Sequence, residues 1–277
     1  MNIYVVRQAT QGLANYVLKK YGNGSVAISH DSRIKADLFM NEAARVLAAN
    51  GIKVYITSEL QPTPVLSYLV RYFKCQAGIM VTASHNPAAY NGYKAYWEDG
   101  AQIIAPHDVN IINHVSRIKP EEIKFKGNPE LIQIIGDEID AAFLANVKAL
   151  SLDPEVIKRQ ADLKIVYTPI HGTGVKLVPQ SIKNYGFTNI IHVPEQDIPS
   201  GDFPTVDSPN PENASAMAMA IAKGKEVNAD IILASDPDAD RIGCVIRDNK
   251  GEYQLINGNQ IVMILSLIHI SEPTRPY

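Results

Sequence analysis

The chain has 277 residues, of which 26 are Lys or Arg, 29 are Asp or Glu and only 2 are Cys, and its net charge is −3. This length suits one large domain or two ordinary ones, and the balanced charge excludes the basic footprint of a nucleic-acid binder. Two cysteines are too few for a disulfide framework or a cysteine zinc site. The longest apolar run, 261–270, is far shorter than the ~20 residues of a membrane helix, and no signal peptide is visible. We expect a cytoplasmic protein with no nucleic-acid or membrane partner.

Helical and strand-like segments alternate from the N-terminus. Apolar residues at helical spacing from Val6 to Val17 predict a first helix, which Gly22 and Gly24 end. The β-type apolar runs that follow predict strands, and the amphipathic stretches between them predict helices. Strands are expected at 25–29, 52–57 and 78–81, a strand-turn-strand at 90–102, and helices at 34–50, 65–73, 108–118 and 129–149.

The same alternation restarts near residue 163. Strands are expected at 164–167, 189–193 and 230–234, and helices at 176–185 and 213–227. Strands that alternate with helices predict an α/β fold with mostly parallel strands. We place the boundary between two such domains near 150–162, which gives a first domain over 1–155 and a second over 156–264. Ligands bind such sheets where the strands end, so polar loops at strand ends are the candidate sites.

Three aspartates directly follow the strand at 230–234. Asp236, Asp238 and Asp240 stand at alternate positions and converge only if the chain turns there. Converging carboxylates repel one another unless a cation lies between them, and hard oxygen ligands favour Mg²⁺ or Ca²⁺. An acidic surface turn is the alternative. An EF-hand does not fit, because its glycine would fall at Arg241, and a haloacid-dehalogenase-type phosphatase needs Thr or Val where this chain has Asp240.

A second polar loop follows the strand at 78–81. It contains Ser84, His85 and Asn86, and Pro87 forces a turn. A serine beside a histidine suggests a nucleophile with its base, but neighbours on an extended segment point to opposite faces. The G-x-S-x-G elbow of hydrolases is absent. A plain turn is the alternative, and Lys94, farther along, reads by itself as an exposed lysine.

Two further loops carry weaker signals. His171–Gly174 is a glycine-rich junction between a strand and a helix, a place where backbone amides can meet a phosphate. It lacks the spacing of a dinucleotide-binding or Walker loop. His30–Arg33 is a polar turn before a helix. Taken alone, each of these loops predicts a structural turn rather than a site.

Together, these motifs resemble the α-D-phosphohexomutase superfamily. Five blocks occur in that family's order and spacing: TASHNP (82–87), YNGYK (90–94), TPIHGTG (168–174), GDFPTVDSPNPE (201–212) and ASDPDADR (234–241). WEDGAQI (97–103) is similar to the branch of phosphoglucomutases and phosphopentomutases. The resemblance extends from residue 1 to about 264. It implies two phosphohexomutase-type α/β domains, each with a mixed, mostly parallel sheet between helices.

The resemblance implies intramolecular transfer of a phosphate on a phosphosugar, through a phosphoserine and a bisphosphorylated sugar intermediate. Ser84 would be the phosphoserine, and Mg²⁺ would be held by Ser84 together with Asp236, Asp238 and Asp240. The partners would be glucose or pentose phosphates and their bisphosphates. Proton transfer at the sugar hydroxyl is implied for His85 and Lys94. Binding of phosphate or substrate is implied for Arg241, Arg33 and Asn86.

Departures from the family pattern predict a fragment. Three family loops are absent: the TAG-[IL]-RG-type loop before the first helix, the sugar-binding loop of a third domain and the distal-phosphate loop of a fourth. We therefore expect an N-terminal fragment that binds Mg²⁺ weakly and lacks mutase turnover. Residues 265–275 are similar to the translation of a transposase adapter from sequencing libraries, so 265–277 is expected to be a non-native tail.

Two alternatives stay open from the sequence. A phosphomannomutase or phosphoglucosamine mutase would use the same mechanism on a different sugar. A non-catalytic module that binds metal or phosphosugar is the other alternative, although the presence of Ser84, Lys94 and the three aspartates argues against it. The run 261–265 is expected to form an exposed apolar patch.

Overall fold

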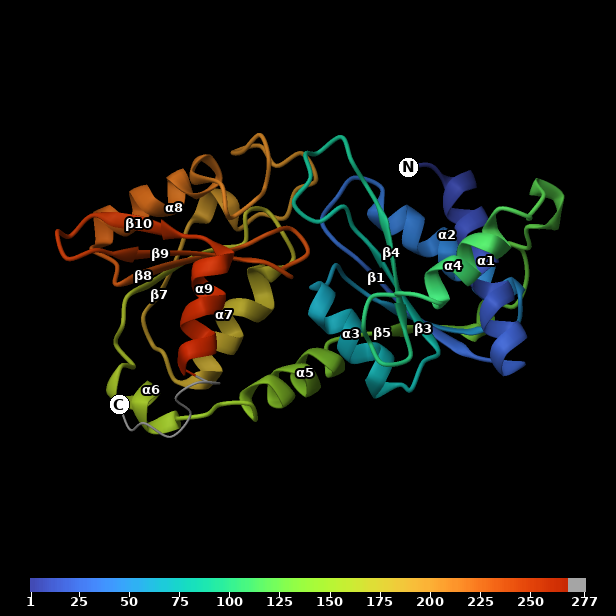
Figure 1. Cartoon of the computed structure of the whole chain (residues 1–277), viewed down its shortest axis with the longest axis horizontal. Helices are drawn as coiled ribbons and strands as arrows, with labels where there is room; N and C mark the ends of the chain where they lie inside the picture. Colours follow the sequence, from blue (N-terminus) through green and yellow to red (C-terminus); the bar gives the residue numbers. More distant parts are fainter. Residues whose placement is uncertain (269–277) are drawn as a thin grey trace.

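The computed structural model describes residues 1–268, which form two five-stranded sheets covered by helices (Figure 1). The strands are β1 (Ser25–His30), β2 (Lys53–Thr57), β3 (Ala77–Val81), β4 (Tyr93–Trp97), β5 (Ile132–Ile135), β6 (Ile165–Thr168), β7 (Ile190–His192), β8 (Ile231–Ser235), β9 (Ile242–Arg247) and β10 (Tyr253–Ile256). The helices are α1 (Ile3–Tyr21), α2 (Ala36–Ala49), α3 (Thr63–Tyr72), α4 (His107–Val115), α5 (Glu138–Lys148), α6 (Pro154–Arg159), α7 (Gly174–Tyr185), α8 (Ala214–Val227) and α9 (Gly258–Ser266). Within this part of the chain, no helix has both the length and the apolar character needed to cross a bilayer.

The first sheet has the order β4-β3-β1-β2-β5. All its neighbouring pairs are parallel except β3 and β4. Side chains of a strand alternate between the two faces of a sheet. Accordingly, Val26 and Ile28 of β1 belong to a core with α1 and α2, whereas Ala27 belongs to a core with α3. The carboxyl ends of β1 and β3 therefore deliver the loops at 30–33 and 82–92 to the same edge of the sheet.

The second sheet has the order β10-β9-β8-β6-β7. β6 is parallel to β7 and β8, while β9 and β10 continue the sheet antiparallel. Val166, Ile232 and Val245 pack against Met217 and Ala220 of α8 in one core, and α7 and α9 lie on the other face (Figure 1). Both sheets are thus mixed α/β sheets between helices, as the resemblance predicted.

Two predicted elements differ from the structure. The strand-turn-strand expected at 90–102 contains one strand, β4, and only an isolated bridge from Tyr96 to Gln102 in place of the second. The helix expected over 129–149 begins only at Glu138, and Ile132–Ile135 forms β5, a parallel edge strand on β2. Isoleucine favours the pleated surface of a sheet, and Gly136 interrupts the helical pattern between the two elements. Strands β9 and β10 lie in a segment for which no element was predicted. The tail predicted at 265–277 starts within α9, and 269–277 lie outside the described residues.

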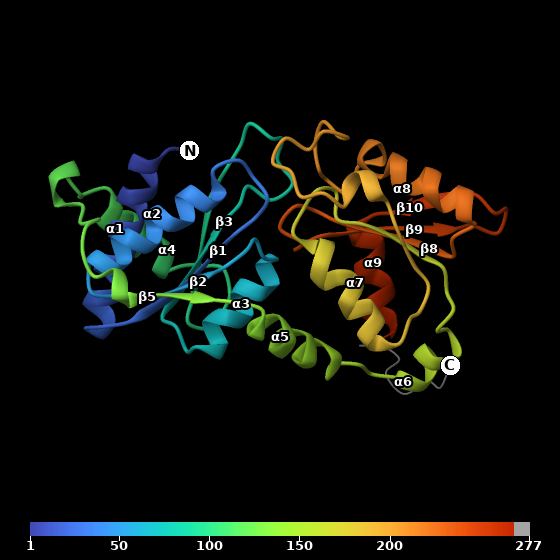
Figure 2. The ribbon, with the colours of Figure 1, turned by 180° about the vertical axis from the view of Figure 1, so that it is seen from behind.

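The two α/β units lie side by side in both views of the ribbon, and the segment that carries α5 and α6 runs from one to the other along their lower side (Figures 1 and 2). Lys176 of α7 donates a hydrogen bond to Asp137 at 2.7 Å and pairs with Asp140 at 2.8 Å. Asp140 also accepts a hydrogen bond from Gln61 at 2.9 Å. Leu177 of α7 joins the core beneath α3 and α5. This contact brings the carboxyl end of β8 close to that of β3.

Candidate active site between the two sheets

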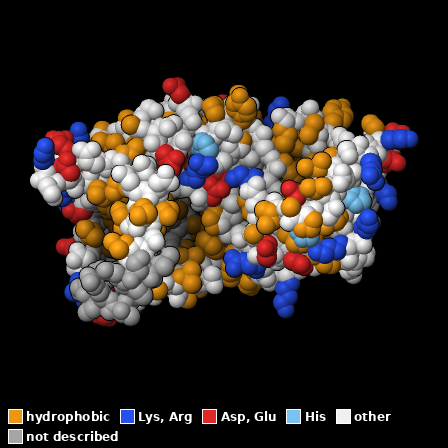
Figure 3. Space-filling view, in the orientation of Figure 1, with side chains coloured by type: hydrophobic (Ala, Val, Ile, Leu, Met, Phe, Trp, Pro, Cys, Tyr) orange, Lys and Arg blue, Asp and Glu red, His pale blue; other side chains and the backbone are white. Residues whose placement is uncertain are grey.

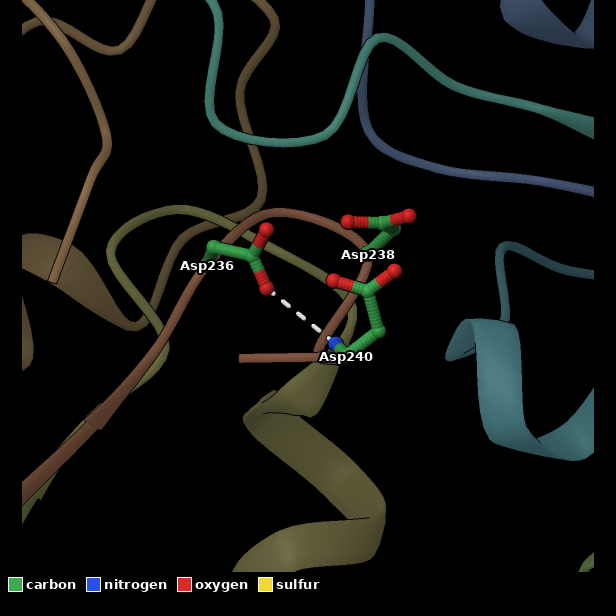
Figure 4. Close-up of side chains that lie close together, drawn as sticks. All are labelled: Asp236, Asp238 and Asp240. Carbon is green, nitrogen blue, oxygen red and sulfur yellow. Dashed lines mark hydrogen bonds between the residues drawn. The ribbon is translucent and has the colours of Figure 1, made fainter. Parts of the chain in front are cut away.

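Three aspartates on the loop after β8 form a compact acidic cluster. A hydrogen bond from the Ala239 N–H to the Asp236 carbonyl, with Ala239 in the left-handed region (φ 51°), makes the chain turn. Carboxylate oxygens of Asp236, Asp238 and Asp240 lie within 4.8 Å of one another, and Figure 4 shows the three side chains gathered beside the loop. Asp236 and Asp238 are 0% exposed, whereas Asp240 is exposed. The convergence that the spacing required is therefore present.

The carboxylates of this cluster repel one another. Burial, followed by the charges of Asp238 and Asp240, raises the pKa of Asp236. Two backbone N–H groups, of Asp240 and Arg241, nevertheless donate to Asp236 Oδ1 at 3.1 Å each. Burial also opposes ionisation of Asp238, but the Lys94 ammonium, together with the hydrogen bond from Thr63 and that with Asp236, outweighs burial and lowers that pKa. Among the described residues, the buried Oδ1 of Asp238 has no hydrogen-bond partner. A cation with oxygen ligands would satisfy this atom and relieve the repulsion.

Ser84 lies directly against the acidic cluster. The backbone of Ser84 is left-handed (φ 53°), and its N–H donates to Thr82 Oγ1 at 2.8 Å. The Ser84 hydroxyl donates to Asp236 Oδ2 at 3.0 Å and lies 3.3 Å from His85 Nδ1. The structure therefore brings together a hydroxyl, an imidazole and a carboxylate from two loops that are 152 positions apart.

Lys94 of β4 is part of the same cluster rather than an isolated surface lysine. Its Nζ donates to Asp238 Oδ2 at 2.8 Å and to Asp240 Oδ2 at 3.0 Å, and its side chain is 20% exposed. Burial by itself would lower the pKa of Lys94, but the two aspartates outweigh burial and raise it. Lys94 is thus held as an ammonium that neutralises part of the charge.

Arg33 differs from the expectation that it contacts phosphate. Its side chain is 1% exposed, and its guanidinium lies 5.1 Å from the ring centre of Phe203. The terminal nitrogens all donate to backbone carbonyls of the serine loop, namely those of Ser84, Asn86, Pro87 and Tyr90. Arg33 therefore clamps this loop from behind through its terminal nitrogens, while its Nε lies 3.3 Å from Asp31 Oδ2.

His85, Asn86 and Arg241 lie on the open side of the cluster. Burial, and then the charge of Arg241, lowers the pKa of His85, so its imidazole is neutral at neutral pH. The Arg241 side chain is exposed and has no hydrogen bond or ion pair with any residue in 1–268. Asn86 is exposed; its backbone N–H donates to the Ala83 carbonyl and its backbone carbonyl accepts from Arg33, so only its side-chain amide is left without a partner within 1–268. The Arg241 guanidinium and the Asn86 side-chain amide are therefore available to an anion.

The glycine-rich loop at 171–174 packs against the aspartate loop, residues 236–241, and its N–H groups bond to protein carbonyls. The N–H of His171 donates to Gln196, that of Gly172 to Pro169, and that of Thr173 to Pro237 in the aspartate loop. His171 also contacts the following loop, with Nδ1 2.9 Å from the Ile198 carbonyl and Nε2 2.9 Å from Thr205 Oγ1. That loop reaches the serine loop, where Ser208 Oγ donates to the His85 carbonyl at 3.0 Å.

Sequence reasoning missed Thr63, the first residue of α3. Its hydroxyl and its backbone N–H both donate to Asp238, at 2.8 Å each. The only local signal was the Pro62-Thr63-Pro64 helix start, which gives no hint of a partner 175 positions away.

Comparison with known proteins points to one family. Two models of the phosphoglucomutase/phosphomannomutase family match the chain, α/β/α domain I over residues 1–122 and α/β/α domain II over residues 141–251. A probable phosphomannomutase of Haemophilus influenzae is 36% identical over 264 residues, which cover 94% of this chain and 53% of that protein. A phosphoglucomutase of Staphylococcus haemolyticus is 36% identical (96% of this chain, 48% of that protein). A phosphopentomutase of Mus musculus is 34% identical (96% and 45%).

A comparison of the fold with solved structures gives a similar result. The crystal structure of a presumed phosphomannomutase from Thermus thermophilus superposes with a TM-score of 0.85 at 26% identity, covering 99% of this chain and 59% of that one. The chain spans about half the length of the curated relatives it matches. With both family models, these relatives and this fold in agreement, the chain belongs to the phosphoglucomutase/phosphomannomutase family of the α-D-phosphohexomutase superfamily.

Proposed function

We propose that this chain carries the phosphoryl-transfer centre of a mutase that moves a phosphate between two positions of a phosphosugar. The observation that carries the proposal is the 3.0 Å contact between the Ser84 hydroxyl and Asp236 within the acidic cluster. Phosphoryl transfer needs a nucleophile, charge neutralisation and correct alignment. Ser84 supplies the nucleophile, and the residues around it supply the other two.

The acidic cluster fits a divalent metal ion, for which we propose Mg²⁺. Three carboxylates and the serine hydroxyl form an all-oxygen donor set, which hard cations prefer, and the unpartnered buried Oδ1 of Asp238 supports this assignment. Asp236, Asp238 and Asp240 would hold the ion, with an oxygen at Ser84 as a further ligand. When bound, the ion would neutralise charge on the transferring phosphoryl group.

The transfer requires one proton to leave the sugar hydroxyl and one to reach the departing serine oxygen. The bond from phosphorus to Ser84 Oγ breaks as the bond to the sugar oxygen forms, so atoms and charge balance. Neutral His85, whose Nδ1 lies 3.3 Å from Ser84 Oγ, is suited to accept the proton that leaves the attacking sugar hydroxyl. Lys94 is the candidate donor of the proton that reaches the departing serine oxygen, because its ammonium form is favoured.

The remaining predicted residues take two different roles in this proposal. Arg241 and Asn86 bind phosphate or substrate, because Arg241 is exposed and its planar fork matches phosphate oxygens. Arg33 positions the serine loop through the backbone carbonyls it binds. We further propose that the two family domains meet near 150–162.

The proposed substrates are glucose 1- and 6-phosphate or pentose 1- and 5-phosphates, with the sugar bisphosphate as intermediate and the cytoplasm as the location. A phosphomannomutase-type substrate is the second candidate, and the name of the Haemophilus influenzae relative favours it. Both candidates share one centre and differ only in the sugar.

The proposal is tested by phosphoryl loading of Ser84. The chain is incubated with Mg²⁺ and glucose 1,6-bisphosphate or ribose 1,5-bisphosphate, and the intact mass is measured. We expect one phosphoryl group on the wild-type chain, located on Ser84, and none on Ser84→Ala or without metal. Loading that persists in Ser84→Ala, or no loading with any aldose bisphosphate, would overturn the proposal. The sugar that loads Ser84 faster separates a hexose from a pentose substrate, and mannose 1,6-bisphosphate in the same assay separates the phosphomannomutase-type candidate.

A further inference from the structure

Thr63 holds an aspartate of the acidic cluster although it belongs to the other α/β unit. It is the first residue of α3, between Pro62 and Pro64, and it is 6% exposed. The Thr63 N–H donates to the Asp238 backbone carbonyl at 2.8 Å, and the Thr63 hydroxyl donates to Asp238 Oδ2, also at 2.8 Å. One residue thus fixes both the backbone and the carboxylate of Asp238.

The two carboxylate oxygens of Asp238 have different surroundings. Oδ2 accepts hydrogen bonds from Thr63 and from Lys94 Nζ, at 2.8 Å each. Oδ1 is buried and has no partner within residues 1–268. Two donors on Oδ2 restrict rotation of the carboxylate, so Oδ1 stays directed away from them.

Thr63 is a more rigid donor than Lys94. Its side chain is short and β-branched, which restricts χ1, and its backbone is fixed at the start of a helix of 10 residues. Lys94 has a flexible stem and divides its ammonium between Asp238 and Asp240. The α3 N-terminus also places the positive end of a helix dipole next to the Asp238 carboxylate.

We propose that Thr63 is a positioning residue of the cation site: its hydroxyl orients Asp238 so that Oδ1 faces a divalent cation. This inference rests on the proposed function, since it assumes that the aspartates hold a cation. Hydrogen bonds to ligating carboxylates typically change metal affinity by about 10- to 100-fold. The contact also ties the cation site to both units, because Thr63 and Asp238 lie 175 positions apart.

The test measures the affinity of the chain for Mn²⁺ alone, by electron paramagnetic resonance of the free ion. Thr63→Val keeps the branched shape and the backbone N–H bond but removes the hydroxyl, and we expect it to weaken Mn²⁺ binding about tenfold. Thr63→Ser restores the hydroxyl and should bind close to wild type. The matched control is Thr57→Val, which removes a buried hydroxyl bonded to Ser29 at 2.9 Å and should leave the affinity unchanged.

The outcomes separate this inference from the proposed function. Equal Mn²⁺ binding by wild type and Asp238→Asn would mean that the aspartates hold no cation, and the proposed function would fail. Loss of binding in Asp238→Asn, with wild-type affinity in Thr63→Val, would overturn only the positioning role. Thermal unfolding without metal is measured in parallel, because a merely structural threonine would lower the melting temperature of Thr63→Val without changing its Mn²⁺ affinity.

Discussion

At the residue scale, the backbone of Ser84 explains how the side chains of two sequence neighbours come to lie together beside the acidic cluster. On an extended segment, Ser84 and His85 would point to opposite faces. The left-handed φ of 53° at Ser84 rotates the chain, so the hydroxyl and the imidazole Nδ1 lie 3.3 Å apart. A non-glycine residue pays about 1–2 kcal/mol for this conformation. The conformation persists because Thr82 accepts the Ser84 N–H and Arg33 binds the Ser84 carbonyl.

Arg33→Lys should destabilise the chain and slow phosphoryl loading of Ser84. A single ammonium cannot bridge the four part-buried carbonyls that the guanidinium binds, and the hydrogen bonds lost cost about 2–4 kcal/mol together. Urea unfolding measures this loss. Arg241→Lys is the matched control, since Arg241 is exposed, and its unfolding free energy should change by less than about 0.5 kcal/mol. Equal stability of the two variants would contradict the clamp.

Cys75 should make stability depend on alkaline pH. The side chain is 1% exposed, and burial raises the pKa of its thiol to about 11. In the unfolded chain the thiol ionises near about 8.5. Between these values the folded state holds a proton that the unfolded state has lost, so the stabilisation present below about pH 8.5 disappears as pH rises.

The check on Cys75 compares wild type with Cys75→Ala by urea unfolding at several pH values. Lysines and tyrosines titrate in both proteins and cancel in the difference. The stability advantage of wild type should shrink by about 2 kcal/mol between about pH 8.5 and 11. A difference that stays constant over this range would show that the buried thiol has an ordinary pKa.

At the element scale, the sequence predicted the strands and helices that carry strong periodicity. β1, β2, β3, β6 and β8 fall where apolar runs were seen, and the polar loops after β3 and β8 were identified as candidate sites. The sequence predicts helix at β5 because its four residues run into a helical pattern with no proline between them. The strand forms through pairing with β2, which lies far away in the sequence. Thr63 and the clamp role of Arg33 could not be predicted, because both depend on partners far away in the sequence.

Gly172→Ala should displace the aspartate loop, although residue 172 is not part of that loop. A Cβ at this position would lie 2.5 Å from Pro237 Cα and 2.8 Å from the Pro237 carbonyl oxygen, and both atoms are backbone that cannot move aside cheaply. Overpacking of this kind costs about 1–3 kcal/mol. We expect lower stability together with weaker Mn²⁺ binding.

Gly22→Ala is the control for the loop variant. Gly22 has a φ of +76° with nothing within 4 Å of a built Cβ, so alanine there costs about 1–2 kcal/mol of backbone strain alone. It should lower stability while Mn²⁺ affinity stays at the wild-type value. If Gly172→Ala also kept that affinity, the loop at 171–174 would not support the cation site.

At the scale of the whole molecule, each α/β unit supplies part of one centre. The first contributes Ser84 and Lys94, and the second contributes the aspartates. The contact between α5 and α7 joins the two units through Lys176, whose charge pairs with the buried carboxylate of Asp140. The site therefore exists only when both units are packed together, which explains why motifs that looked bland singly acquire a role in combination.

The exposed apolar surface of α9 is the other feature of the whole molecule, because it is not covered within residues 1–268. Val262, Met263, Ile264 and Leu265 are 63%, 70%, 48% and 48% exposed, so the predicted exposure of this run is confirmed. Met263 and Ile264 also line a groove of about 600 Å³ beside Ile246. Figure 3 shows hydrophobic side chains gathered over this part of the surface.

We expect this face to bind a hydrophobic dye and to promote self-association, since contiguous exposed apolar patches do both. The double variant Val262→Lys, Met263→Glu should reduce dye fluorescence and shift the chain toward monomer in analytical ultracentrifugation. Its melting temperature should change little, because both side chains are exposed. Leu150→Lys with Leu152→Glu changes two leucines that are 68% and 77% exposed outside α9, and this control should leave dye binding unchanged. A wild-type chain that is monomeric and binds no dye would show that the α9 face is not an adhesive surface.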